Sequence, residues 1–253
     1  MIEICSLASG SNGNCYYIGN ETEAIIIDGG ISHRKMMQRI EEVGINYLKI
    51  RAAFVSHEHH DHIAGLRVIS KRLNIPVYFS WGTYNATIKK ERPIETIIFN
   101  DESVINISDH IKVFPFKKKH DATDPYSFRV EIDNVSIGVI TDIGIAEQNC
   151  QEHFSKCSAV FLEMNYDPEM LKNGPYPYYL KQRVGSDLGH LSNFQALDLI
   201  KNYSSPNLSL IIASHISAEN NCSEKVLETL SEISSKYTIE LASRYQVGKV
   251  HVI

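Results

Sequence analysis

Residues His57–His62 read His-Glu-His-His-Asp-His, so four of the chain's 11 histidines fall within six residues. Dense histidine tracts are typical of metal sites, because imidazole is the commonest metal-binding side chain. The tract directly follows the apolar segment Ile50–Ser56, which predicts a buried strand. On a loop leaving that strand, His57 and His59 can serve one ion while Asp61 and His62 serve a neighbouring ion. This ligand set suits Zn²⁺, and also Mn²⁺ or Fe²⁺; the alternative is a polar surface loop.

Strands and helices alternate on both sides of this tract. Short apolar runs predict strands over residues 2–7, 15–19, 23–28, 50–56, 76–79, 112–116, 126–132, 135–141, 159–163, 208–214, 239–241 and 249–253. Amphipathic patterns predict helices over residues 32–43, 62–73, 145–154, 192–203 and 223–237. This alternation, with antiparallel hairpins mixed in, indicates an α/β protein with helices covering sheet. No long linker interrupts the pattern, so we expect a single domain over residues 1–253.

The composition excludes several classes of protein. Hydrophobic residues make up 43% of the 253 residues and charged residues 22%, a balance that excludes a disordered chain. The apolar runs are far shorter than the roughly 20 residues of a membrane span. The first residues, MIEICSLASG, lack the pattern of a secretory signal, so we expect a cytoplasmic protein without membrane association. The net charge of −5 gives no global indication of a nucleic-acid partner.

The histidine tract and several later residues resemble the metallo-β-lactamase superfamily. That resemblance implies a four-layer αββα sandwich, in which two mixed sheets carry helices on their outer faces and two divalent metal ions bind at one edge. It assigns His57, His59 and His120 to the first metal. It assigns Asp61, His62 and His215 to the second metal, with Asp142 shared between them. It also implies that Asp28 supports the histidine loop by hydrogen bonds. Each later residue follows a predicted strand, where α/β sheets place their sites.

Further segments resemble the YycJ/WalJ-type branch of this superfamily. They are SGSNGNC (residues 9–15), LEMNYD (162–167), residues 176–193 and SHISAENN (214–221). Members of this branch are described as nucleases, with double-stranded DNA exonuclease activity among the proposals. The branch shares features with ribonuclease Z-type phosphodiesterases, which carry an extra active-site histidine. His190, in Gly189-His190-Leu191-Ser192, matches that position.

The implied function is that of a dinuclear-metal hydrolase, a phosphodiesterase or nuclease that uses a metal-bridging hydroxide. Zn²⁺ is the first choice of metal, and Mn²⁺ or Fe²⁺ also suit the ligands. Asp61 is expected to steer the attacking water, and His190 to contact a phosphate oxygen or protonate the leaving alkoxide. The alternative role for His190 is to cap the helix that opens at Ser192.

Residues near the expected metals suggest contacts with an anionic substrate. Lysines 117–119, Lys181 and Arg183 lie close in sequence to His120 and His190, and tyrosines 176, 178 and 179 offer stacking faces. Ser9, Ser11, Asn12 and Asn14 could donate hydrogen bonds to phosphate, although a tight turn explains them as well. Asn165 is a candidate substrate contact, and Glu163 a candidate partner that orients a histidine. A solvated lysine face is the alternative for the charge run.

Two other functions remain open at this point. Thioester or lactone hydrolases of the glyoxalase II type share the metal ligands, but usually add a C-terminal helical region, and only 38 residues follow His215. A non-catalytic, metal-stabilised binding protein would be expected to lose one or more ligands. We therefore expect nucleic acid or another phosphodiester as the partner. The native metal, DNA versus RNA and the oligomeric state do not follow from the sequence.

Overall fold

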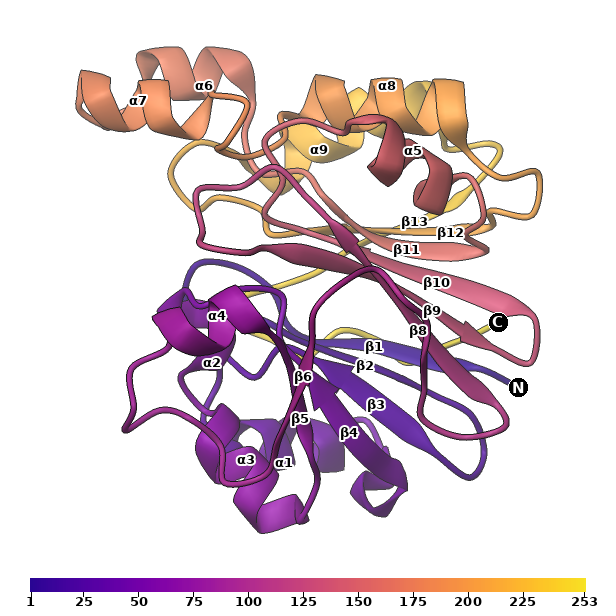
Figure 1. The fold of residues 1–253 in the computed structure, drawn as a ribbon. Coiled ribbons are helices and arrows are strands. Elements are labelled where there is room, and N and C mark those ends of the chain that lie inside the picture. The colour runs from indigo at the N-terminus through magenta and orange to yellow at the C-terminus, as the bar shows by residue number, and fades with distance from the viewer.

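The computed structural model describes residues 1–253 and contains two seven-stranded sheets that pack face to face (Figure 1). The first sheet has the order β14-β1-β2-β3-β4-β5-β6. Its strands are β1 (Glu3–Ala8), β2 (Cys15–Gly19), β3 (Ala24–Ile27), β4 (Ile50–Phe54), β5 (Val77–Ser80), β6 (Thr96–Phe99) and β14 (His251–Val252). The second sheet has the order β13-β12-β11-β10-β9-β8-β7. Its strands are β7 (Ile105–Asn106), β8 (Ile111–Lys117), β9 (Tyr126–Ile132), β10 (Val135–Ile140), β11 (Ala159–Glu163), β12 (Leu210–Ser214) and β13 (Thr238–Leu241).

Helices cover the outer face of each sheet (Figure 1). The first sheet carries α1 (His33–Glu42) and α3 (Leu66–Leu73), and the second carries α5 (Gln148–Phe154), α8 (Asn193–Tyr203) and α9 (Ser223–Leu230). The short elements are α2 (His60–Ile63), α4 (Trp81–Ala86), α6 (Pro168–Asn173), α7 (Tyr178–Val184) and the 3₁₀ turns η1 (Tyr47–Lys49) and η2 (Ser231–Ile233). The predicted four-layer αββα sandwich is therefore confirmed. No helix is long and apolar enough to cross a bilayer.

Three apolar layers hold the sandwich together. A cluster of 22 buried residues lies between the sheets, and a cluster of 20 fills each space between a sheet and its helices. Strand β2 shows the arrangement, because Tyr16 and Ile18 belong to the central cluster while Cys15 and Tyr17 belong to an outer one. Both faces of the inner strands are covered, which explains why β2, β3, β11 and β12 are buried throughout.

The direction of the strands brings distant loops together. Strands β3 to β6 run parallel in the first sheet, and β10 to β13 run parallel in the second. Parallel strands end at the same edge of a sheet, so the segments after them meet there. The two edges face each other at one end of the sandwich (Figure 1). This arrangement creates a shared rim that loops from both halves of the chain occupy.

The predicted elements differ from the structure in two helical regions. The helix expected over residues 62–73 is two helices, α2 and α3. The Gly65 N–H donates to the carbonyl of Gly29 (2.8 Å) and the Asp61 carbonyl accepts from the Asn14 N–H (2.8 Å), so the helical hydrogen bond between Gly65 and Asp61 is not made. The stretch around residues 167–179, which gave no helical pattern, forms α6 and α7. There Pro168 occupies the first turn of α6 behind the capping side chain of Asp167, and Pro177 is the N-cap of α7. Proline is well tolerated at these positions, because the first backbone N–H groups of a helix have no acceptor within the helix and the missing N–H of proline is not needed.

Candidate metal centre

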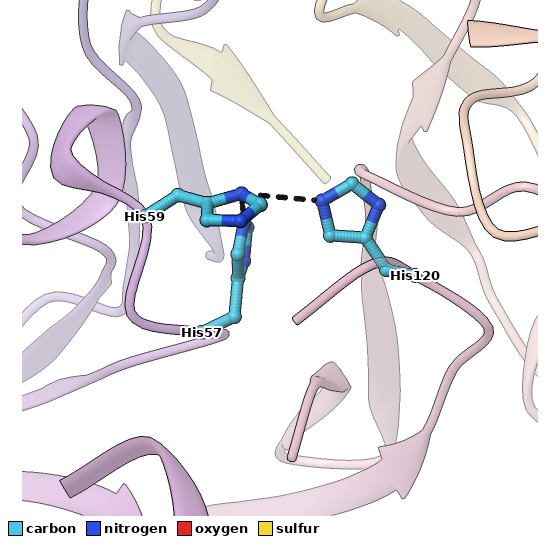
Figure 2. Close-up of side chains that lie close together, drawn as sticks. All are labelled: His57, His59 and His120. Carbon is cyan, nitrogen blue, oxygen red and sulfur yellow. Dashed lines mark hydrogen bonds between the residues drawn. The ribbon is translucent and has the colours of Figure 1, made fainter. Parts of the chain in front are cut away.

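Three imidazole rings from two segments converge at the rim. His57 and His59 belong to the loop between β4 and α2, and His120 follows β8. Figure 2 shows the three rings pointing toward one another; His59 Nδ1 lies 3.0 Å from His57 Nε2 and 3.4 Å from His120 Nε2. Burial lowers the pKa of His57 well below its usual value and that of His120 to about 4. Both rings are therefore neutral near pH 7, the form in which imidazole binds a metal.

A second cluster lies beside the first and contains more carboxylates. His62 Nε2 is 3.5 Å from Asp61 Oδ2 and 3.3 Å from Asp142 Oδ2, and His215 Nε2 is 3.8 Å from Asp61 Oδ2. The ligand atoms of Asp61, His62 and His215 lie within 4.8 Å of one another, and so do those of His57, His62 and Asp142. Asp142 thus lies between the two clusters. All seven residues expected as metal ligands are brought together.

The chemistry of these side chains fits bound cations. Asp28, Asp61, Asp142 and Glu163 bring four carboxylates to the centre, whereas Lys118 is the one buried lysine beside them. The buried atoms Asp142 Oδ2 and His215 Nε2 have no hydrogen-bond partner. Burial lowers the pKa of His215, but the carboxylates of Asp142, Asp61 and Glu163 outweigh it and raise that pKa to about 10. A cluster with this surplus of negative charge attracts either protons or divalent cations.

Hydrogen bonds fix which nitrogen of each ring faces the centre. His62 Nδ1 donates to Asp28 Oδ2 (2.7 Å), His120 Nδ1 to the carbonyl of Gly189 (3.1 Å), and His215 Nδ1 to Glu163 Oε1 (2.9 Å). Ser56 Oγ donates to Asp28 Oδ2 (2.8 Å) and so can accept from His57 Nδ1 (2.9 Å). In all four rings Nδ1 is thus engaged and Nε2 faces the other candidate ligands, although His62 Nε2 also lies 3.1 Å from Asn14 Nδ2. Such outer partners set the tautomer and the orientation of metal-binding histidines.

The loop over residues 9–15 contacts the clusters in a way that the sequence pattern did not specify. The Asn14 side chain accepts from the Gly10 N–H (2.9 Å) through Oδ1, which aims its Nδ2 at Asp61 Oδ2 (3.2 Å) and His62 Nε2 (3.1 Å). The backbone N–H of His215 donates to Ser9 Oγ (2.8 Å). Ser9 and Asn14 therefore hold the candidate ligands, while Ser11 and Asn12 are exposed on the rim. The Gly/Ser/Asn composition of residues 9–15 indicated a loop, but it did not indicate which of its side chains contact the candidate ligands.

The other residues expected to contact substrate fall into two groups: some are buried and hydrogen-bonded within the centre, and others lie outside it and contact neighbouring residues. Asn165 is buried and donates to the carbonyl of His215 (2.9 Å), so it supports a candidate ligand. Lys118 is buried and donates to the carbonyl of Thr141 (2.7 Å). Lys181 Nζ donates to the carbonyl of Lys172 (2.6 Å), and Arg183 pairs with Asp121, one residue after His120. Their roles toward a substrate stay predictions.

His190 lies at the edge of the centre. Its Nδ1 donates to Glu163 Oε1 (2.9 Å), and its side chain is 21% exposed. Its ring centroid is 5.3 Å from those of His120 and His215. The first turn of α8 is capped by Ser192 and Gln195 in a reciprocal pair of hydrogen bonds. Glu163 therefore connects His190 to His215, because the same carboxylate oxygen accepts from both.

Comparison with known proteins also identifies the metallo-β-lactamase superfamily. Residues 8–132 match the family model described as the metallo-beta-lactamase superfamily. Exodeoxyribonuclease YycJ of Bacillus anthracis is 28% identical over 246 residues, which covers 95% of this chain and 92% of that protein. Exodeoxyribonuclease WalJ of Streptococcus pneumoniae serotype 2 is 30% identical over 223 residues, covering 86% and 82%. Among solved structures, the metallo-beta-lactamase fold protein YhfI of Bacillus subtilis superposes with a TM-score of 0.72 at 15% identity and covers both chains completely.

Proposed function

Because the chain belongs to the metallo-β-lactamase superfamily, in the group of the YycJ and WalJ exodeoxyribonucleases, we propose that it is a metal-dependent exonuclease that hydrolyses DNA phosphodiester bonds. The observation that carries this proposal is the convergence of seven imidazoles and carboxylates in two adjacent clusters that meet at Asp142. Two-metal centres of this kind serve phosphodiester hydrolysis.

We assign one cation to the His57, His59 and His120 cluster and one to the cluster of Asp61, His62 and His215, with Asp142 between them. Three imidazoles favour Zn²⁺ at the first position, and the carboxylates of the second also accept Mn²⁺. When bound, these cations supply the activation of water and the neutralisation of phosphate charge. Asn14 holds Asp61 in place beside them through its Nδ2 group.

His190 is assigned the role of proton donor to the leaving oxygen. Its Nδ1 is occupied by Glu163, so Nε2 is the atom that meets a substrate at the rim. A carboxylate on the far side of an imidazole stabilises the protonated ring, which can then give its other proton to an alkoxide. The His190 side chain is 21% exposed, so part of the ring faces solvent at the rim.

The test compares two substrates that differ in their leaving groups. Metal-free protein is supplied with Zn²⁺ or Mn²⁺ and given end-labelled DNA or bis(p-nitrophenyl) phosphate. We expect metal-dependent cleavage of both substrates, lost in Asp61→Ala. His190→Ala should lower kcat for DNA by about 10²–10⁴-fold and have a much smaller effect on the nitrophenyl ester, whose leaving group needs no proton.

Three results would contradict these assignments. If His190→Ala lowered kcat equally for both substrates, His190 would not be the proton donor to the leaving oxygen. Internal cuts in a DNA circle, without release of nucleotides from ends, would replace the exonuclease by an endonuclease. Turnover of a thioester without diester cleavage under any of the metals would overturn the proposed function itself.

A further inference from the structure

The segment over residues 81–92 presents an exposed aromatic surface at the rim. Trp81, the chain's single tryptophan, immediately follows β5 and is 56% exposed. Its ring stacks on Tyr84 with centroids 6.4 Å apart and an angle of 26° between planes. The Arg92 guanidinium covers the Tyr84 ring at 4.3 Å. Tyr84 thus contacts both the Arg92 guanidinium and the indole of Trp81, and the indole is more than half exposed.

Contacts on two sides tie this segment to the loops of the metal centre. Asp124, in the loop between β8 and β9 that also contains His120, accepts from the Gly82 N–H through its carboxylate (3.3 Å) and from Ser80 Oγ through its carbonyl (2.9 Å). Glu91 lies 3.8 Å from His60 of the histidine tract. Figure 1 shows α4 at the same end of the first sheet as α2. The segment that carries the indole is therefore attached to two loops that contain candidate ligands.

The charge of the segment suits a polyanion. Lys89, Lys90 and Arg92 provide three cations against one acid, Glu91, in a chain whose net charge is −5. Lys89 and Lys90 are exposed. A further cation, Arg67, donates to the carbonyl of Arg92 (2.9 Å). Exposed aromatic rings beside lysine and arginine are the combination by which proteins hold single-stranded nucleic acid.

We propose that Trp81 stacks an unpaired nucleobase while the Lys89–Arg92 segment contacts the phosphates of the same strand. The inference rests on the proposed nuclease function and specifies its substrate class, a strand with an unpaired end. Bases inside a duplex are already stacked on both faces, so only an unpaired base offers a free face to the indole.

Tryptophan emission gives a direct test, because Trp81 is the only source of it. The full chain is titrated in EDTA, which prevents cleavage, with a short oligothymidylate and separately with inorganic polyphosphate. We expect saturable quenching by the oligothymidylate and little change with polyphosphate, which has charge but no bases. Absence of quenching by the oligothymidylate, or equal quenching by both polyanions, would overturn the proposal.

Kinetics provide the second test. The quantity measured is the ratio of kcat/KM for single-stranded DNA to kcat/KM for bis(p-nitrophenyl) phosphate, which corrects for any loss of folded protein. Trp81→Ala should lower this ratio by about 5-fold to 150-fold, the range of base–aromatic stacking, through a higher KM for DNA. Trp81→Phe, which keeps a ring, should restore most of it.

The matched control is Tyr47→Ala, because Tyr47 is 40% exposed but precedes β4, at the other end of the same sheet. That variant should keep the wild-type ratio. An unchanged ratio in Trp81→Ala, with both substrates cleaved by the wild type, refutes the stacking site and leaves the proposed function intact. Failure of the wild type to cleave either substrate refutes the proposed function instead.

Discussion

Three residues of the centre leave their strands through a left-handed backbone. Asp28, Asp142 and His215 have φ values of 62°, 54° and 53°, and each lies just beyond the end of β3, β10 or β12. Such a conformation costs a residue with a Cβ about 1 kcal/mol or more, and it persists only where the surroundings enforce it. At this rim, the side chains of these three residues with the left-handed conformation enter the centre from the two sheets. The strain therefore belongs to the site and adds nothing to stability.

Asp28→Asn is predicted to weaken metal binding without unfolding the chain. The amide keeps the shape of the carboxylate, but it lacks the charge that accepts from His62 Nδ1, Ser56 N and Ser56 Oγ. Loss of such a partner typically lowers metal affinity about 10–100-fold. Calorimetric titration with Zn²⁺ measures the change, and Asp109→Asn, at an exposed position, is the control. Equal affinities in the two variants would contradict this role for Asp28.

His153 is predicted to make stability depend on pH. It stacks on Phe116 with centroids 4.3 Å apart, its Nδ1 has no partner, and burial lowers its pKa to about 4. The unfolded chain, with a histidine pKa near 6.5, binds more protons between these values. The free energy of unfolding should therefore fall as the pH drops from about 6.5 to about 4, by about 1 kcal/mol because solvent screens this half-buried ring.

The variant His153→Phe keeps the stack and removes the titrating group. Urea unfolding in EDTA, followed across this pH range, should show a smaller fall in stability for the variant than for the wild type. The comparison isolates His153, because the other histidines are common to both proteins. Parallel curves would show that His153 does not contribute.

Between elements, the backbone packs tightly where the segment after β3 meets the histidine tract at the start of α2. A Cβ added at Gly30 would lie 1.6 Å from the carbonyl oxygen of Asp61 and 2.8 Å from the backbone nitrogen of Asn14. Gly30→Ala is therefore predicted to displace the tract, lowering the free energy of unfolding by about 3 kcal/mol and weakening metal binding. Gly185→Ala is the matched control, because its nearest neighbour would be 3.4 Å away.

Thermal unfolding and Zn²⁺ titration of the two variants check this prediction. The control should stay within about 0.5 kcal/mol of the wild type. Wild-type stability and affinity in Gly30→Ala would mean that the backbone of the tract can move aside without consequence.

At the same scale, sequence patterns predicted most strands and the ends of several helices. Ser32 caps α1, and Ser192 with Gln195 caps α8, as their sequence positions indicated. The segment over residues 81–99, with α4 and β6, gave no clear pattern, because its helix is only six residues long and its strand lies at a sheet edge. Short elements of this kind are defined by their neighbours, such as Asp124 against Gly82, and not by local periodicity.

For the whole molecule, the metal centre joins the two sheets. Asp61 and His62 follow a strand of the first sheet, and Asp142 and His215 follow strands of the second. Removal of the metals is therefore predicted to lower the Tm. A site saturated at 100 times its Kd contributes about 2.7 kcal/mol, which corresponds to roughly 5–10 °C in a chain of this size.

Calorimetric scans with Zn²⁺ and with EDTA measure this shift. His215→Ala, which lacks one candidate ligand, should show a smaller difference between the two conditions. The same Tm with and without metal in the wild type would show that no cation is bound by the folded chain.

The histidine tract and the family resemblance identified the candidate ligands, and their positions after strands that end at a shared edge explain why the fold brings them together. The hydrogen bonds that support these ligands could not be predicted from the sequence. The orientation of Asn14 depends on the Gly10 N–H, and the pairing of Glu163 with both His190 and His215 depends on residues 27 and 52 positions away. Such contacts depend on the detailed course of loops, which no local pattern of residue types encodes.

The division of the ligands between two sheets has a mechanical consequence. If one sheet slid along the other, the candidate ligands of each cluster would move apart, because each cluster takes residues from both sheets. The interior that resists such sliding includes Tyr16 and Phe161, whose rings meet across the sandwich with centroids 5.0 Å apart. The alignment of the candidate ligands thus depends on buried aromatic residues between the sheets, one of which, Tyr16, also donates to Asn14 Oδ1.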